Sequence, residues 1–209
     1  VPQWREGGNA GAVYLGSVGE TPPGFEQAGG VDWVYFGNEQ PAPRGEAIVV
    51  AKNSPIRSVT QLRGKKVALN KGSNVHFLLV KALQQAGLSY ADIQPVYLTP
   101  ADARAAFVQG SVDAWVIWDP YLAAIERQAN VRTLANGDGL VRNTQYYVAG
   151  RQFANAQSQV LHTLLDEVNG VDSWARDNVA QMAAQLSPLV GLDAATLASF
   201  VVSTTPVAR

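Results

Sequence analysis

The sequence predicts an α/β fold with mixed sheets, and two observations carry this prediction. Short runs rich in β-forming residues alternate along the chain with segments in which apolar residues recur every three or four positions, as on one face of a helix. Three of the strand-like runs enter a short loop that opens directly into a helix. Such loops lie at the carboxyl ends of strands, where α/β proteins bind their ligands.

Composition excludes several classes of function. The 209-residue chain has a net charge of −1, so we expect no nucleic-acid partner. It contains no cysteine, which excludes a thiol nucleophile, a cysteinyl zinc site and an iron–sulfur cluster. No apolar run reaches the roughly 18 residues that a membrane-spanning helix needs. Val1–Arg5 does not have the pattern of a signal peptide, so a secreted protein would be present here in processed or trimmed form.

The three strand–loop–helix segments are distributed over the first two thirds of the chain. Their strands are expected at Ala12–Leu15, Lys66–Leu69 and Ala114–Trp118. The loops are Gly16–Thr21, Asn70–Asn74 and the single residue Asp119, and the helices run to about Ala28, Ala86 and Gln128. We expect Ser73 or Asn74 to cap the second helix, and Asp119 to cap a third helix that starts with Pro120.

The remaining chain completes this pattern. Val96–Leu98 reads as a strand, and a helix that starts at Thr99–Pro100 returns the chain to the next parallel strand. Two β-rich runs, Glu46–Ala51 and Thr144–Ala149, are predicted to be crossovers between two lobes. The chain after Gly150 reads as helical, with an apolar stripe of Val160, Leu161, Leu164, Leu165, Val168, Val171 and Trp174 and two shorter helices near 179–186 and 193–202.

The loop Asn70–His76 has the clearest potential for binding an anion. The first N–H groups of a helix lack intrahelical acceptors, and the helix dipole adds partial positive charge there. The alternative is that Ser73 and Asn74 only cap the helix while Lys71 is solvated. Trp118 likewise belongs either to the core or to the apolar wall of a pocket.

The acidic residues and histidines do not form a catalytic pattern. Glu20 and Asp119 would repel an anion, so we interpret them as helix caps or polar contacts at the cleft edge, or as partners for a ligand amine. His162 reads as structural, and His76 lies where a helix dipole lowers the pKa of imidazole. No nucleophile, base and orienting residue occur together, and two histidines make a weak metal site. We therefore expect no enzyme, no cofactor and no metal.

The loop regions resemble those of a known protein family. Gly64–His76, Pro100–Phe107 and Gly110–Pro120 are similar to the ligand-loop regions of aliphatic-sulfonate-binding proteins of ABC importers, within the group that also binds taurine, nitrate and thiamine precursors. The run Gly16–Pro23 resembles the first-lobe loop of the same family. The likeness extends from about residue 12 to residue 187.

The resemblance implies a two-lobed, type II periplasmic-binding-protein-like fold with a ligand cleft at the hinge. Lobe one would comprise residues 1–49 and 148–209 and lack its opening strand, and lobe two would comprise 50–147. The ligand-binding residues would be Gly19, Glu20, Thr21, Ser73, Asn74, Val75, Trp118 and Asp119.

The resemblance also implies a function. The protein would be a periplasmic monomer that captures an alkanesulfonate and delivers it to the membrane subunits of an ABC permease. The sulfonate would dock at the Ser73–Asn74 helix start, with the alkyl tail against Trp118. Alternatives are a binder of taurine, nitrate or an organic carboxylate, an enzyme of the thiamine-precursor kind, and a stand-alone sensor domain.

Overall fold

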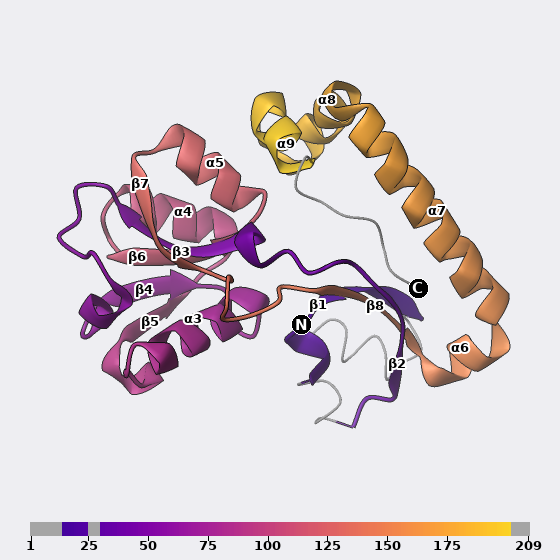
Figure 1. Ribbon diagram of the computed structural model, residues 1–209, viewed down its shortest axis with the longest axis horizontal. Coiled ribbons are helices and arrows are strands. Elements are labelled where there is room, and N and C mark those ends of the chain that lie inside the picture. Colours follow the sequence, from indigo (N-terminus) through magenta and orange to yellow (C-terminus); the bar gives the residue numbers. More distant parts are fainter. Residues whose placement is uncertain (1–13, 25–29, 202–209) are drawn as a thin grey trace.

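The chain folds into two sheets of different size that lie side by side (Figure 1). The computed structural model describes residues 14–24 and 30–201. The smaller sheet, in the first lobe, has the order β1-β8-β2 and comprises β1 (Leu15–Gly19), β8 (Gln145–Gly150) and β2 (Trp33–Asn38), with both neighbours antiparallel to β8. The larger sheet, in the second lobe, has the order β5-β4-β6-β3-β7. The predicted α/β class with mixed sheets is confirmed.

The larger sheet combines parallel and antiparallel strands. Its strands are β3 (Glu46–Ala51), β4 (Lys66–Leu69), β5 (Gln94–Tyr97), β6 (Ala114–Trp118) and β7 (Val131–Asn136). Strands β5, β4 and β6 run parallel, whereas β3 is antiparallel to both β6 and β7. Strands β3 and β6 are buried over almost their whole length because helices cover both faces of the sheet.

Helices pack on the two faces of the larger sheet as the apolar spacing predicts. Helix α3 (Asn74–Gln85) covers one face, and α4 (Pro100–Val108) and α5 (Tyr121–Gln128) lie over the other (Figure 1). The buried side of α3 consists of the predicted positions Val75, Leu78, Leu79, Ala82 and Leu83. The apolar periodicity of this helix therefore identified its core face correctly.

Two predicted element boundaries are wrong. Strand β1 occupies most of the loop predicted at Gly16–Thr21, because this small-residue segment pairs with β8 from Leu15 opposite Ala149 onward. Residues 22–24 are helical, and the predicted strand start at Ala12 and helix end near Ala28 lie outside the described residues. Helix α5 begins at Tyr121 rather than at Pro120, which occupies the N-cap position.

The two runs predicted as crossovers are strands. Glu46–Ala51 is β3, at the centre of the larger sheet, and most of Thr144–Ala149 belongs to β8 of the smaller sheet. The chain passes between the sheets through residues 39–45, which include the short 3₁₀ helix η1 (Pro43–Gly45), and through residues 137–144. We propose that these two connections, rather than residues 49 and 148, separate the lobes.

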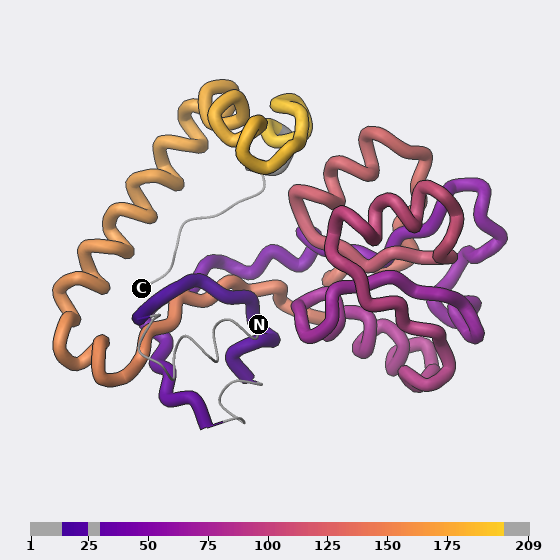
Figure 2. Tube along the Cα trace, turned by 180° about the vertical axis from the view of Figure 1, so that it is seen from behind, coloured from indigo at the N-terminus to yellow at the C-terminus, as the bar shows by residue number. Residues whose placement is uncertain are grey.

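The C-terminal helices connect the lobes a third time. Helix α6 (Arg151–Ala156) follows β8, and the long α7 (Ser158–Asp177) leads away from the smaller sheet to α8 (Val179–Val190) and α9 (Ala194–Val201), beside α5 (Figure 2). Ala124 of α5 packs in one apolar cluster with residues of α8, α9 and the turn between them. Of the predicted α7 stripe only Leu161 and Leu165 are buried. None of the helices in the described ranges is long and apolar enough to cross a membrane.

Candidate functional site

Strand order creates a crevice at one end of the larger sheet. The chain leaves β4 through α3 to reach β5 on one side, and then passes through α4 to β6 on the other side of β4. At such a reversal, neighbouring loops diverge to opposite faces and open a crevice outside the carboxyl ends of the strands. The loops that follow β4 and β6 begin at Asn70 and Asp119. These are two of the three loops that the sequence singled out.

A cavity of about 680 Å³ occupies this crevice and extends to the smaller sheet. Its walls come from both lobes and from both connections between them: Gly19, Pro22, Glu39, Pro41, Ala42, Pro43, Arg44, Gly45, Ser73, Asn74, Trp118, Asp119, Asp138, Asn143 and Gln145. The volume lies in the range of pockets for small organic ligands.

Five of the eight predicted binding residues line this cavity: Gly19, Ser73, Asn74, Trp118 and Asp119. The other three, Glu20, Thr21 and Val75, do not line it. Val75 is fully buried in the core under α3. Glu20 accepts hydrogen bonds from the backbone N–H groups of Asn143, at 3.1 Å, and Thr144, at 3.5 Å. Its charge is thus used on the connection between the lobes, where Glu20 makes a polar contact with residues that lead into strand β8 and does not cap a helix there.

Asn74 joins the two lobes at the cavity. Its Oδ1 accepts a hydrogen bond from the backbone N–H of Thr21 at 3.2 Å, and its Nδ2 donates to Oδ1 of Asn143 at 3.0 Å. The backbone at Gly19 approaches the Asn74 amide so closely that a Cβ there would lie 2.4 Å from Oδ1. Glycine at position 19 is therefore required for this contact between the lobes.

The N-terminus of α3 is open toward the cavity. Ser73 is the N-cap residue, as predicted, but its side chain makes no cap hydrogen bond and instead donates to the carbonyl of Asn70 at 2.8 Å. The first N–H groups of the helix are thus left without side-chain capping by Ser73. The Lys71 ammonium lies 5.2 Å from the centre of the Tyr97 ring. The loop offers oriented N–H donors where an anion is favoured.

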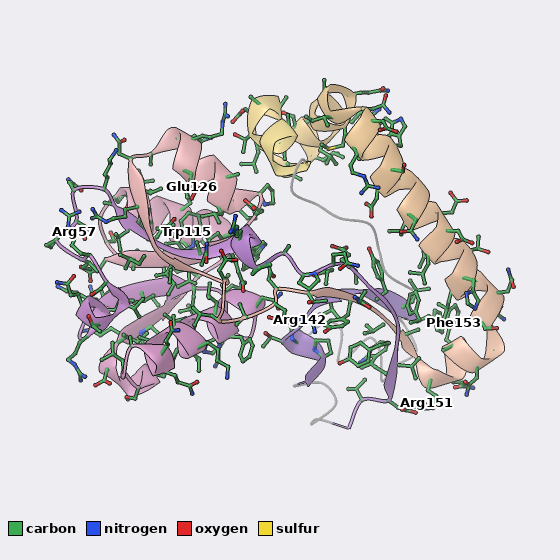
Figure 3. The ribbon with its side chains drawn as sticks, viewed as in Figure 1. Arg57, Trp115, Glu126, Arg142, Arg151 and Phe153 are labelled. Carbon is green, nitrogen blue, oxygen red and sulfur yellow. The ribbon has the colours of Figure 1, made fainter. Side chains whose placement is uncertain are left out.

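Strand alternation places the two tryptophans of β6 on opposite faces of the larger sheet, and Trp118, at the end of the strand, packs against the apolar clusters on both faces. Trp115 is 1% exposed and lies inside the second lobe (Figure 3). Trp118 is only half-buried and lines the cavity. With the prolines of residues 41–43 it supplies apolar surface beside the polar loop of α3.

The cavity residues on the two connections were not predicted from the sequence. The exposed guanidinium of Arg44 forms an ion pair with Asp138, with Nε and Oδ2 2.8 Å apart. Glu39 accepts a hydrogen bond from the Tyr147 hydroxyl at 3.0 Å, and burial raises the pKa of its carboxyl group. These connections are irregular and carry no periodic signal. Proline-rich composition around Pro41 and Pro43 was the available hint of a non-strand segment.

Histidines and carboxylates form no metal centre within residues 14–24 and 30–201: no three of these side chains are placed to hold an ion together. His162, interpreted as structural, is exposed on α7. The pKa of His76 is lowered as predicted, but through burial and the nearby charge of Lys71.

Asp119 carries the pH dependence that we expect of the cavity. Its Oδ1 accepts a hydrogen bond from the N–H of Ala123 at 3.0 Å, and burial raises the pKa of its carboxyl group to about 6. Because its protonation removes a negative charge from the cavity, affinity for a monovalent anion should rise about three- to tenfold from pH 7.5 to pH 5. Calorimetry at both pH values measures this. Asp119→Asn should show a smaller rise in affinity between the two pH values. A rise equal to that of the unmodified protein would contradict the role of Asp119.

The fold and the cavity define the class of protein to which the chain belongs. Residues 41–172 match the family described as NMT1/THI5 like, and the chain belongs to that family.

More specific likenesses lie within this class. The chain is 47% identical to the periplasmic aliphatic sulphonate binding protein SsuA from Escherichia coli, with a TM-score of 0.90 over 99% of this chain and 67% of that one. The alkanesulfonate-binding protein SsuA from Xanthomonas axonopodis pv. citri, solved bound to MOPS, is 38% identical, with a TM-score of 0.89 over 99% of this chain and 71% of that one.

A curated Escherichia coli (strain K12) relative, also described as an aliphatic sulfonates-binding protein, is 48% identical over 95% of this chain and 62% of its own length. The chain thus spans less than two thirds of that relative. The predicted resemblance is confirmed, and these relatives are named as binding proteins.

Proposed function

We propose that this chain is a solute-binding protein that captures aliphatic sulfonates in the cavity between its lobes. The observation that carries the proposal is the open N-terminus of α3, which faces the same cavity as the apolar surface of Trp118. A sulfonate with an alkyl tail has matching parts, one anionic and one apolar. The names of the relatives support the same ligand class.

In this proposal the sulfonate oxygens accept hydrogen bonds from the N–H groups at Ser73–Val75 and from side chains of the loop. The alkyl tail lies against Trp118. Gly19, Glu20 and Thr21 act from the first lobe, because they hold Asn74 and the connection at Asn143 in place. Movement of the lobes about residues 39–45 and 137–144 would exclude water and strengthen the polar contacts.

The proposed role is transport. Binding by hydrogen bonds and apolar contact needs no covalent chemistry, so the chain acts as a carrier and not as an enzyme. A carrier of this class works as a monomer in the periplasm and delivers its ligand to the membrane subunits of an ABC permease.

Taurine is the second candidate ligand, and one observation favours it. Glu39 and Asp119 both line the cavity, and their carboxyl groups are suitable partners for an ammonium group. Direct competition between taurine and butanesulfonate, measured by calorimetry, separates the two candidates.

A series of alkanesulfonates from methane to hexane tests the proposal. Each buried CH₂ contributes about 0.8 kcal/mol, so affinity should rise up to about fourfold for each carbon in the unmodified protein. Trp118→Ala should flatten this rise while leaving methanesulfonate almost unaffected. Equal steps in both proteins would exclude Trp118 as the wall for the tail.

Ser73→Ala tests the other end of the ligand. Loss of the hydroxyl, which shapes the loop by donating to the carbonyl of Asn70, should weaken all members of the series by a similar factor of up to about ten, because a neutral hydrogen bond of this kind is worth about 0.5–1.5 kcal/mol. The same titrations measure it. Unaltered affinity would rule out the head-group assignment.

A further inference from the structure

We infer that His76 is a positioning residue for the anion loop, in which an uncharged imidazole takes the place that a carboxylate occupies in an ordinary helix cap. The inference rests on the proposed function, since it explains how the helix N-terminus is held without a negative charge beside the ligand.

The side chain of His76 makes one hydrogen bond back to the loop that precedes α3. Nδ1 of His76 accepts a hydrogen bond from the backbone N–H of Gly72 at 3.1 Å. Because a backbone N–H only donates, Nδ1 carries no proton, and the neutral ring holds its proton on Nε2. Gly72 itself has a φ of 76°, a left-handed conformation that favours glycine. The side chain of His76 thus fixes the turn that leads into α3.

This position normally belongs to an acidic or amide side chain. With Ser73 as N-cap, His76 is the third residue of α3, the position from which Glu or Gln reaches back to the N-cap backbone N–H in a capping box, whereas His76 accepts from Gly72, one residue earlier. A glutamate there stabilises an ordinary helix through the dipole. At an anion site the same charge would compete with the ligand. Imidazole accepts the hydrogen bond without contributing that charge.

The surroundings of His76 keep it neutral. The groups that face it are the Lys71 ammonium from the loop, Tyr90 from the 3₁₀ helix η3 (Tyr90–Asp92) and Tyr97 at the end of β5. The His76 ring centre lies 5.1 Å from that of Tyr90, whose hydroxyl is 3.2 Å from the Tyr97 hydroxyl. Burial and the charge of Lys71 both lower the pKa of His76, so the ring remains an acceptor near neutral pH.

Two variants separate the hydrogen bond from the charge. His76→Gln preserves a neutral acceptor and should bind butanesulfonate within about threefold of the unmodified protein. His76→Glu preserves an acceptor but adds a negative charge, and should weaken binding roughly 10- to 100-fold at pH 7.5. The ratio of its affinity to that of His76→Gln should rise toward one at high ionic strength, because salt screens the repulsion between the new carboxylate and the ligand, which a purely structural defect would not produce. Affinity for His76→Glu equal to that of His76→Gln at pH 7.5 would overturn the inference.

A measurement without ligand keeps the inference separate from the proposed function. In ¹⁵N-resolved NMR spectra of the purified chain, His76 should show the tautomer protonated at Nε2 and should titrate below 6.5, the ordinary pKa of histidine. Protonation at Nδ1 in the neutral form would overturn the inference, whether or not sulfonates bind. If the unmodified protein shows the expected tautomer and does not bind sulfonates, the proposed function fails, whereas the positioning of Gly72 by His76 stands.

Discussion

Replacing Asn74 with alanine should weaken the binding of an alkanesulfonate about a hundredfold, the largest loss that we expect from any single truncation. The Asn74 side chain bonds to the first lobe at Thr21 and to the connection at Asn143. Asn143 has a left-handed conformation with a φ of 51°. It extends this series of hydrogen bonds, because its Nδ2 donates to the carbonyl of Ala42 at 2.9 Å. Each bond is worth about 0.5–1.5 kcal/mol, so loss of both costs roughly 1–3 kcal/mol.

The hundredfold loss has two causes: the hydrogen bonds from Asn74 to Thr21 and Asn143 are broken, and a polar group beside the anion is removed. Calorimetric titration of butanesulfonate measures the loss of affinity. Asn70→Ala is the matched control, because Asn70 lies on the same loop and its side chain takes no part in the hydrogen bonds that join the lobes within residues 14–24 and 30–201. Asn74→Asp should lose still more affinity, since it keeps an acceptor for Thr21 but places a negative charge in the cavity. Wild-type affinity in Asn74→Ala would contradict the role of this link.

Replacing Glu46 with glutamine should stabilise the protein strongly at high pH. Glu46 is fully buried, and neither carboxyl oxygen has a hydrogen-bond partner in the part of the chain that the structure describes. Burial, together with the negative charge of Glu20, raises the pKa of Glu46 from its ordinary 4.5 to about 8. A buried carboxyl group of this kind is stable in the protein only when it is neutral.

The sign of the pH dependence follows from this shift. The pKa of Glu46 is higher in the folded protein than in the unfolded chain. Its contribution to the free energy of unfolding is therefore fully present below pH 4.5 and is lost as pH rises through about 8. The difference between these pKa values corresponds to at most about 5 kcal/mol at high pH.

Urea unfolding at pH 5, 7 and 9 measures the effect, in which Glu46→Gln should match the unmodified protein at pH 5 and exceed it by roughly 2–5 kcal/mol at pH 9. Glu126→Gln, at an exposed position on α5 (Figure 3), is the control and should change the pH dependence little. The same pH dependence in Glu46→Gln as in the unmodified protein would contradict the assignment of this titration to Glu46.

Local patterns in the sequence were enough to predict the second-lobe half of the candidate site. The spacing of Val75, Leu78 and Leu79 identifies the buried face of α3, and a strand followed by a short loop that ends at Ser73 places the helix start at the crevice. These features depend only on neighbours within one or two turns.

The first-lobe half and the connections depend on pairing over long distances. Strand β1 has the composition of a loop and forms only because residues near Ala149 pair with it. Arg44 and Asp138 are separated by 94 positions, and nothing local indicates that they meet at the cavity. β-Strand formation of this kind is decided by cross-strand partners rather than by intrinsic propensity.

The central claim is that the cavity between the lobes binds a sulfonate at the N-terminus of α3 and its tail at Trp118. An NMR titration of the ¹⁵N-labelled chain with hexanesulfonate tests it most directly, because it locates the ligand while it measures affinity. We expect the backbone N–H signals of Ser73, Asn74 and Val75 and the indole N–H of Trp118 to shift together along one saturating curve, with the buried indole of Trp115 nearly unchanged. Saturable shifts confined to other residues, or none at millimolar ligand, would contradict the claim.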